Sequence, residues 1–116
     1  MAALAGVVLS VLVSLTSAGT CYLDPVWPNS SIQVLSNITF GQAFNNATNQ
    51  MQILQLDAYL PPPTDTRTKR PVAVVVHGGG FDAGDKTWQG GVDLTMALVS
   101  RCFAVVSVNY RLTGDF

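Results

Sequence analysis

The stretch Val72–Phe81, VAVVVHGGGF, decides the fold, because an apolar run ends there at one histidine and three glycines. Four of the five residues from 72 to 76 are valine. β-Branched side chains pack well in a parallel strand that is covered on both faces, where no polar alternation is needed. We therefore predict a buried strand. The glycines after it carry no β-carbon, so their backbone N–H groups can closely approach an anionic ligand.

Two further strands are expected before this stretch. Residues 38–44, ITFGQAF, suit a short edge strand that is bulged at Gly41. Residues 52–60 alternate, so we expect a buried face made of Leu54, Leu56, Ala58 and Leu60, with Gln55, Asp57 and Tyr59 on the other face. Three prolines end this strand, and a polar, exposed linker over residues 64–70 follows. The two strands are predicted to pair antiparallel.

After the glycines the sequence predicts a long loop, a helix and another buried strand. The helix is expected from about Gly91 or Val92 to Arg101, and the strand over residues 104–108. This order is the start of an α/β domain, in which long loops after parallel strands bind ligands. Two parallel strands and one helix leave open hydrophobic edges. We therefore do not expect residues 19–116 to fold alone.

The N-terminus has the features of an export signal. No charged side chain precedes Asp24, and an apolar stretch over residues 4–15 is short for a membrane span. Small residues from 16 to 19 permit cleavage after Ala18 or Gly19. We predict a signal peptide over residues 1–18, a secreted chain from residue 19, and no stable membrane span after cleavage. An uncleaved membrane anchor is the alternative.

Several short motifs agree with export. Asn29, Asn37 and Asn46 each begin an Asn-x-Ser/Thr sequon, which is a glycosylation acceptor in a eukaryotic secretory pathway. Cys21 and Cys102 can form a disulfide in an oxidising compartment, but each can also pair elsewhere or stay free.

Composition argues against other classes of protein. The formal net charge is −1, and the short basic cluster within residues 67–70 suits a solvated surface turn, so a nucleic-acid partner is not expected. The chain has one histidine and no C-x-x-C motif, so we expect no metal site.

From about residue 38 to residue 112, the sequence resembles the N-terminal part of an α/β hydrolase. Four segments carry the resemblance in order: LQLDAYLPP, RPVAVVVHGGGF, GDK and SRCFAVVSVNYRL. They are similar to the esterase and lipase branch with a His-Gly-Gly-Gly turn, which includes hormone-sensitive-lipase-like and carboxylesterase-like groups. The resemblance implies the N-terminal portion of an α/β-hydrolase fold, with an antiparallel strand pair followed by a parallel β-α-β unit.

The resemblance also implies roles for residues of the turn. The backbone N–H groups of Gly79 and Gly80 would stabilise the oxyanion of the tetrahedral intermediate. His77 and Gly78 would support the turn, with His77 in a structural role and not the triad base. Phe81 would line the acyl side of the site or pack beneath the loop. Alanine at either oxyanion glycine should obstruct the hole more than it alters the fold.

Outside the turn, the resemblance makes Asp85 and Arg111 scaffold residues that anchor loops through charge-assisted bonds. Cys102 departs from the pattern, because the family commonly has glycine between this helix and strand. A left-handed helix cap is easy for glycine and costly for most other residues, so we expect the helix to end differently here.

The catalytic residues of the family are not found in this sequence. Its chemistry needs a Gly-x-Ser-x-Gly nucleophile, then Asp or Glu, then His. No serine after the predicted signal stands between two such glycines, and the only histidine lies in the turn. We interpret the chain as the N-terminal part of a secreted hydrolase of small-molecule carboxylic esters, with no cofactor. The alternatives are a non-catalytic binding or adhesion protein of the same fold, and an amidase or peptidase.

Overall fold

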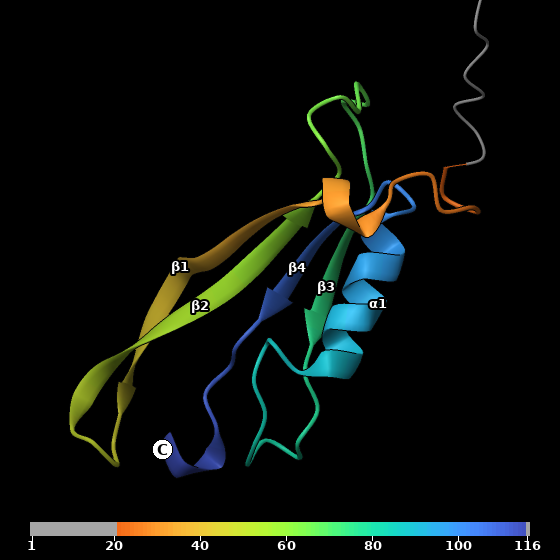
Figure 1. Ribbon diagram of the computed structural model, residues 1–116. Helices are drawn as coiled ribbons and strands as arrows, with labels where there is room; N and C mark the ends of the chain where they lie inside the picture. The colour runs from red at the N-terminus through yellow and green to blue at the C-terminus, as the bar shows by residue number, and fades with distance from the viewer. Residues whose placement is uncertain (1–20, 116) are drawn as a thin grey trace, which may run out of the picture.

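The computed structural model describes residues 21–115, which form a four-stranded mixed sheet with a helix on one side (Figure 1). The elements in chain order are η1 (Asn29–Ser31), β1 (Gln33–Asn45), β2 (Gln50–Leu60), β3 (Val72–Val76), α1 (Gln89–Val99), β4 (Ala104–Val108) and η2 (Thr113–Asp115). The predicted signal peptide and its cleavage site lie outside the described residues. No helix within residues 21–115 is long and apolar enough to cross a membrane.

The strand order is β1-β2-β4-β3. Antiparallel ladders join β1 to β2 and β2 to β4, while β3 and β4 are parallel and are connected through α1. The antiparallel pair followed by a parallel β-α-β unit is the predicted arrangement, and it is confirmed. The helix α1 begins at Gln89, two residues before Gly91, which was the earlier of the two predicted starts.

Strand β1 is longer than predicted. It begins at Gln33, five residues before the expected start, because its first residues pair with the end of β2. The register shifts between Leu35 and Ile38 and again between Thr39 and Gly41, so the predicted bulge is present. β1 stands at the end of the sheet order, as expected of an edge strand.

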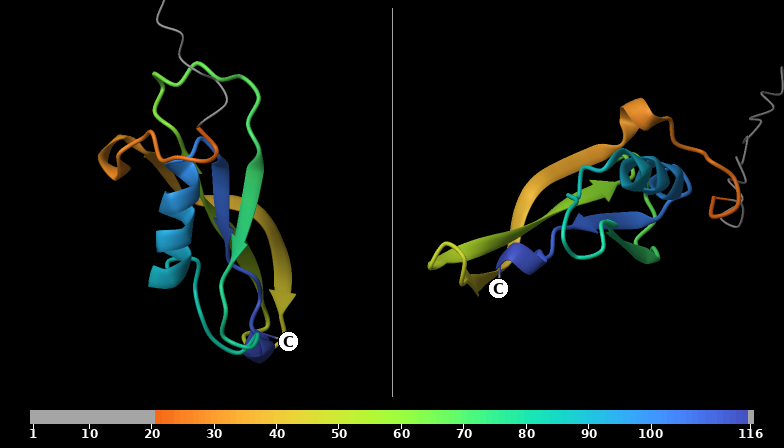
Figure 2. Two further views of the ribbon diagram at one scale, coloured as in Figure 1. Left: turned by 90° about the vertical axis from the view of Figure 1, so that its right-hand side faces the viewer. Right: turned by 90° about the horizontal axis from the view of Figure 1, so that it is seen from below.

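The helix covers the face of the sheet opposite to the one predicted (Figure 2). Tyr59, Val75 and Val105 pack with Val99 of α1, and Asp57 is buried on the same face. The buried face predicted from the alternation of β2 was therefore wrong. Asp57 can be buried because a lysine from a loop forms an ion pair with it, and alternation within one strand does not reveal such a partner.

The other face of the sheet is apolar and has no cover among residues 21–115. Val72, Val74 and Val76 of β3 are 68%, 61% and 58% exposed. The prediction of a strand covered on both faces therefore holds for one face within the described residues. Cross-strand neighbours continue the same apolar face, since Val74 pairs with Val106, and Val106 with Ala58.

The end of α1 keeps the geometry that favours glycine. Cys102 has φ 68°, its N–H donates to Val99 O (2.9 Å), and the N–H of Phe103 donates to Leu98 O (3.3 Å). These two bonds form a Schellman motif, which normally places glycine at the left-handed position. The expectation that this helix ends differently is therefore wrong: cysteine takes the left-handed conformation, and it forms a disulfide with Cys21.

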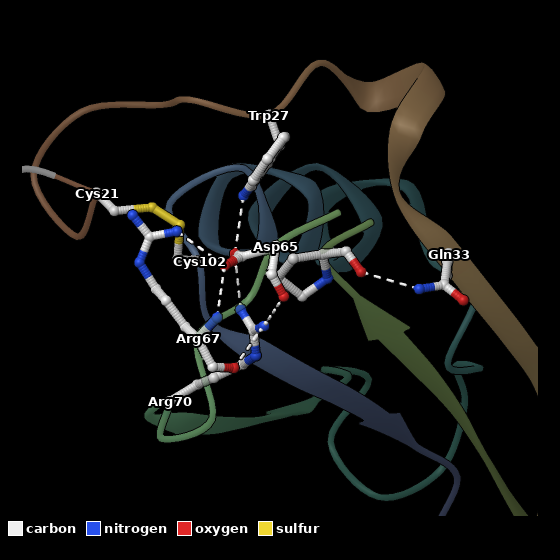
Figure 3. Close-up of polar contacts among 8 residues, drawn as sticks. Cys21, Trp27, Gln33, Asp65, Arg67, Arg70 and Cys102 are labelled. Atoms are coloured by element: carbon white, nitrogen blue, oxygen red, sulfur yellow. Dashed lines mark hydrogen bonds and ion pairs between the residues drawn. A yellow bond between two sulfur atoms is a disulfide. The ribbon is translucent and has the colours of Figure 1, made fainter. Parts of the chain in front are cut away.

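The linker before β3 contains a buried carboxylate (Figure 3). The side chain of Asp65 is 1% exposed and forms salt bridges with Arg67 (2.9 Å) and Arg70 (2.8 Å), and it accepts a hydrogen bond from Trp27 Nε1 (3.1 Å). The prediction of a wholly exposed linker is wrong at this residue, because four donor groups satisfy its oxygens. Burial raises the pKa of Asp65, but the bonds from Arg70, Arg67 and Trp27 outweigh burial and lower it to about 2.

Candidate functional site

The glycine turn begins one residue after the end of β3, at the carboxyl edge of the parallel strands. Gly79 has φ 122° and Gly80 has φ 62°, conformations that L-residues rarely adopt. The N–H groups of Asp82 and Ala83 both donate to Gly79 O, at 3.1 and 3.2 Å. The chain therefore reverses tightly here, and Figure 1 shows the following loop beside the C-terminal segment.

His77 is fixed inside the turn. Its ring is buried, its Nδ1 donates to Gly78 O (2.8 Å), and it stacks on the ring of Tyr110 at 4.3 Å between centroids. The hydroxyl of Tyr110 donates to the backbone oxygen of His77 (3.0 Å). A carbonyl oxygen only accepts hydrogen bonds, so the contact between His77 Nδ1 and Gly78 O places the ring proton on Nδ1. The contacts suit a residue that supports the turn.

The backbone N–H groups of Gly79 and Gly80 have no acceptor among residues 21–115. A Cβ at Gly80 would meet no atom within 4 Å, so this position borders open space. A Cβ at Gly79 would overlap the backbone oxygen of Ala83. We therefore expect different effects of alanine at the two glycines. In Gly79→Ala the turn itself must deform, whereas in Gly80→Ala the methyl group enters free space beside the turn.

Phe81 is exposed at the end of the turn. Its side chain is 69% accessible and makes an edge contact with Tyr110 at 5.7 Å between ring centroids. Its backbone oxygen accepts a hydrogen bond from the N–H of Thr113 (2.7 Å). Of the two predicted placements, packing beneath the loop does not fit this exposure. Phe81 instead presents an apolar surface next to the glycine amides.

Asp85 anchors the loop that follows the turn. Its carboxylate accepts hydrogen bonds from Thr87 Oγ1 (2.6 Å), Thr87 N (2.8 Å) and Asn109 Nδ2 (2.9 Å). The bonds from Thr87 and Asn109 lower the pKa of Asp85 to about 2. Asn109 also accepts a hydrogen bond from the N–H of Lys86 (2.6 Å) and so ties the loop to the end of β4. These contacts match the scaffold role predicted for Asp85.

A buried ion pair fixes the same loop from below. Lys86 Nζ lies 2.8 Å from Asp57 Oδ1, and the two side chains are 7% and 4% exposed. The backbone oxygen of Lys86 accepts a hydrogen bond from Ser107 Oγ (2.9 Å). Sequence reasoning missed this pair because it placed Asp57 on the face opposite to the one predicted to be buried. The available signal was a single acidic residue in an otherwise uncharged strand, together with a single lysine in the loop.

The C-terminal segment closes the site on its other side. Arg111 donates to Phe44 O (3.2 Å), as a loop anchor would. Next to it lies a cavity of about 260 Å³ between β2, Asp85 and Tyr110. Gly79 and Gly80 do not line this cavity. The cavity is therefore a polar hollow separate from the two free amides of the turn.

Comparison with known proteins assigns the chain to a family. The family model described as BD-FAE matches residues 56–116, which include the end of β2, then β3, the glycine turn, α1 and β4. The chain belongs to the BD-FAE family. The matched region includes every residue of the turn discussed above.

A solved structure supports the same fold. Esterase B from Lactobacillus rhamnosis, inhibited by a tributyrin phosphonate, is similar over 81% of this chain, with 22% identity and a TM-score of 0.54. A candidate carboxylesterase from Lactobacillus plantarum WCFS1 is similar over 72% of this chain, with 23% identity and a TM-score of 0.44. This BD-FAE chain spans 27% of the first structure and 30% of the second. The fold is the N-terminal portion of an α/β hydrolase of the esterase type, as the sequence predicted.

Proposed function

We propose that this chain supplies the oxyanion-binding part of a secreted carboxylic-ester hydrolase. The observation that carries the proposal is the pair of glycine amides at Gly79 and Gly80, which follow a parallel strand and have no acceptor among the described residues. Gly80 also borders open space. Membership of the BD-FAE family and the esterase-type fold support it.

The proposed chemistry is acyl transfer. A serine outside this sequence would attack the ester carbonyl, and the carbonyl oxygen would gain negative charge in the tetrahedral intermediate. Fixed N–H donors aimed at that oxygen stabilise the transition state, and each donor is worth about 3 to 4 kcal/mol. The turn suits this role because His77, Tyr110 and Asp85 hold it in place before any substrate binds.

Phe81 would contribute to substrate binding. Its exposed ring adjoins the amides of the turn, so the apolar part of an ester could lie against it while the carbonyl oxygen faces Gly80. Burial of apolar surface at this position would favour esters with hydrocarbon acyl or alcohol groups.

The proposal of secretion has independent support. The disulfide between Cys21 and Cys102 suits an oxidising compartment, and Cys21 lies three residues after the end of the predicted signal. Neither observation bears on the esterase chemistry, so the two parts of the proposal can fail separately.

The test is hydrolysis of 4-nitrophenyl butyrate by the purified gene product that carries these residues. In Gly80→Ala, the added methyl group and the loss of the preferred φ displace one donor, so kcat should fall by about a hundredfold or more with little change in folding. Gly41→Ala is the matched control, because a Cβ there meets nothing within 4 Å and the residue lies in β1. Absence of esterase activity in the wild type, or full activity in Gly80→Ala, would contradict the proposal.

A further inference from the structure

All three glycosylation sequons lie along one edge strand. Asn29 begins η1 just before β1, Asn37 lies within β1, and Asn46 follows its last residue. The three side chains are exposed, and none donates or accepts a hydrogen bond among residues 21–115. Each amide nitrogen is therefore free to react.

The same strand carries an unusual amount of exposed apolar surface. β1 has 13 residues and is the terminal strand of the described sheet. Its large apolar side chains are between 39% and 51% exposed, and they are Val34, Leu35, Ile38, Phe40 and Phe44. A long, apolar edge with unpaired backbone groups favours pairing with another chain and aggregation. Charged side chains are the usual protection, and β1 contains none.

Asn37 is held in a position that presents its side chain. It has φ 60°, a left-handed conformation that asparagine adopts more readily than most residues. Its backbone N–H donates to Asp57 Oδ1 (2.8 Å), and its backbone oxygen accepts a hydrogen bond from Gln55 Nε2 (3.3 Å). The backbone is thus fixed from the covered side of the sheet, while the side chain stays in solvent.

We propose that Asn29, Asn37 and Asn46 carry N-linked glycans, which cover the open edge of β1. In the reaction, an oligosaccharide linked to a lipid diphosphate is transferred to the asparagine amide. The bond between sugar C1 and the diphosphate oxygen breaks, a bond between C1 and the amide nitrogen forms, and one amide proton is lost. The proposal rests on the proposed export of the chain but not on the proposed ester hydrolysis.

The first test is expression of the full chain, with its own N-terminus, in eukaryotic cells. Electrophoresis before and after treatment with a peptide N-glycosidase should show a shift that corresponds to three glycans. The Thr39→Ala variant should show a shift for only two glycans, because it removes the sequon but leaves Asn37 unchanged. The Thr39→Ser variant should show the shift for all three glycans, because the sequon is preserved. Asn49→Gln should also keep all three glycans, since Asn49 is exposed in the same hairpin but begins no sequon.

A single form whose mobility does not change on enzyme treatment would overturn the proposal. So would a Thr39→Ala chain that shows the same mobility shift as the wild type. The result is independent of esterase activity. Glycans without hydrolysis would leave this inference standing and would count against the proposed function alone.

The second test addresses the cover of the edge. The triple variant Ser31→Ala, Thr39→Ala, Thr48→Ala carries no sequon. In light scattering it should show a smaller fraction of monomer and a larger fraction of oligomers than the glycosylated wild type. Adding Phe40→Lys should restore the monomer, because a charge on an edge strand opposes pairing. If the triple variant stays as monomeric as the glycosylated wild type, the glycans do not protect this edge.

Discussion

The hydroxyl group of Thr95 is buried in α1 and has no hydrogen-bond partner among the described residues. A buried hydroxyl that gains no bond lowers stability, because it has lost its water. Thr95→Val replaces the hydroxyl with a methyl group of the same shape. We expect it to raise the free energy of unfolding by about 1 kcal/mol in urea denaturation.

Thr95→Ser provides the opposite control at the same position. It keeps the unpaired hydroxyl and removes a buried methyl group, so it should lower the free energy of unfolding by about 1 kcal/mol. A valine variant that is less stable than the wild type would show that the hydroxyl finds a partner in solution.

The buried pair of Lys86 and Asp57 is the second residue-scale feature that can be measured. Lys86→Met leaves the Asp57 carboxylate buried without its counter-charge, so it should lower the free energy of unfolding by about 3 to 5 kcal/mol. Adding Asp57→Asn should recover part of this loss. The amide is neutral, and its oxygen can still accept the hydrogen bond from the N–H of Asn37.

Lys69→Met is the matched control for Lys86→Met, because Lys69 is exposed and belongs to no salt bridge among residues 21–115. It should change stability by less than about 0.5 kcal/mol. Equal effects of the two substitutions would mean that the buried pair contributes nothing beyond a surface charge.

At the scale of elements, the junction between α1 and β4 combines backbone strain at Cys102 with stabilisation by a disulfide, and the two have opposite effects on the free energy of unfolding. The left-handed conformation of Cys102 costs about 1 kcal/mol relative to glycine, whereas a disulfide that closes a loop of this size typically contributes about 2 to 4 kcal/mol. The bond to Cys21 therefore outweighs the strain. It also joins the segment before β1 to the helix, where Val26 N donates to Ser100 O (2.8 Å).

The two effects can be separated in a Cys21→Ala background, in which no disulfide forms. There, Cys102→Gly should be about 1 kcal/mol more stable than Cys102→Ala, because glycine suits the left-handed position. Thermal unfolding of the two double variants measures the difference. Equal stability would show that the Schellman geometry relaxes once the disulfide is absent.

At the scale of the whole molecule, the sequence predicted the elements that depend on local signals. The valine run, the glycine turn and the helix after it are all specified within a few residues. The face covered by α1 could not be predicted, because the burial of Asp57 depends on Lys86, which is 29 residues away in the sequence. Asp65 was missed for the same reason, since Trp27 approaches it from the N-terminal segment.

The candidate site divides in the same way. The glycines of the turn are recognisable from their sequence alone. The stacking of Tyr110 on His77 and the contact between Thr113 and Phe81 join segments that are far apart in the chain. Single-residue patterns do not encode such pairings, because the geometry arises only when β4 packs beside β3.

The buried carboxylate of Asp65 makes the stability of the whole molecule depend on pH. Burial alone would raise its pKa, but the hydrogen bonds from Arg70, Arg67 and Trp27 lower it from 3.8 to about 2. A lowered pKa means that the folded state prefers the charged form. The resulting stability, about 2 kcal/mol, is fully present above pH 3.8 and is lost as the pH falls through 2.

Asp65→Asn should therefore flatten the pH dependence of the unfolding midpoint between pH 4 and pH 2, as measured by circular dichroism in urea. Asp24→Asn is the matched control, because Asp24 is exposed and makes no hydrogen bond among the described residues. Asp85 also has a pKa lowered to about 2, but it is exposed, so solvent screens its contribution. If Asp65→Asn unfolds with the same pH profile as the wild type, the arginines and Trp27 do not stabilise this carboxylate in solution.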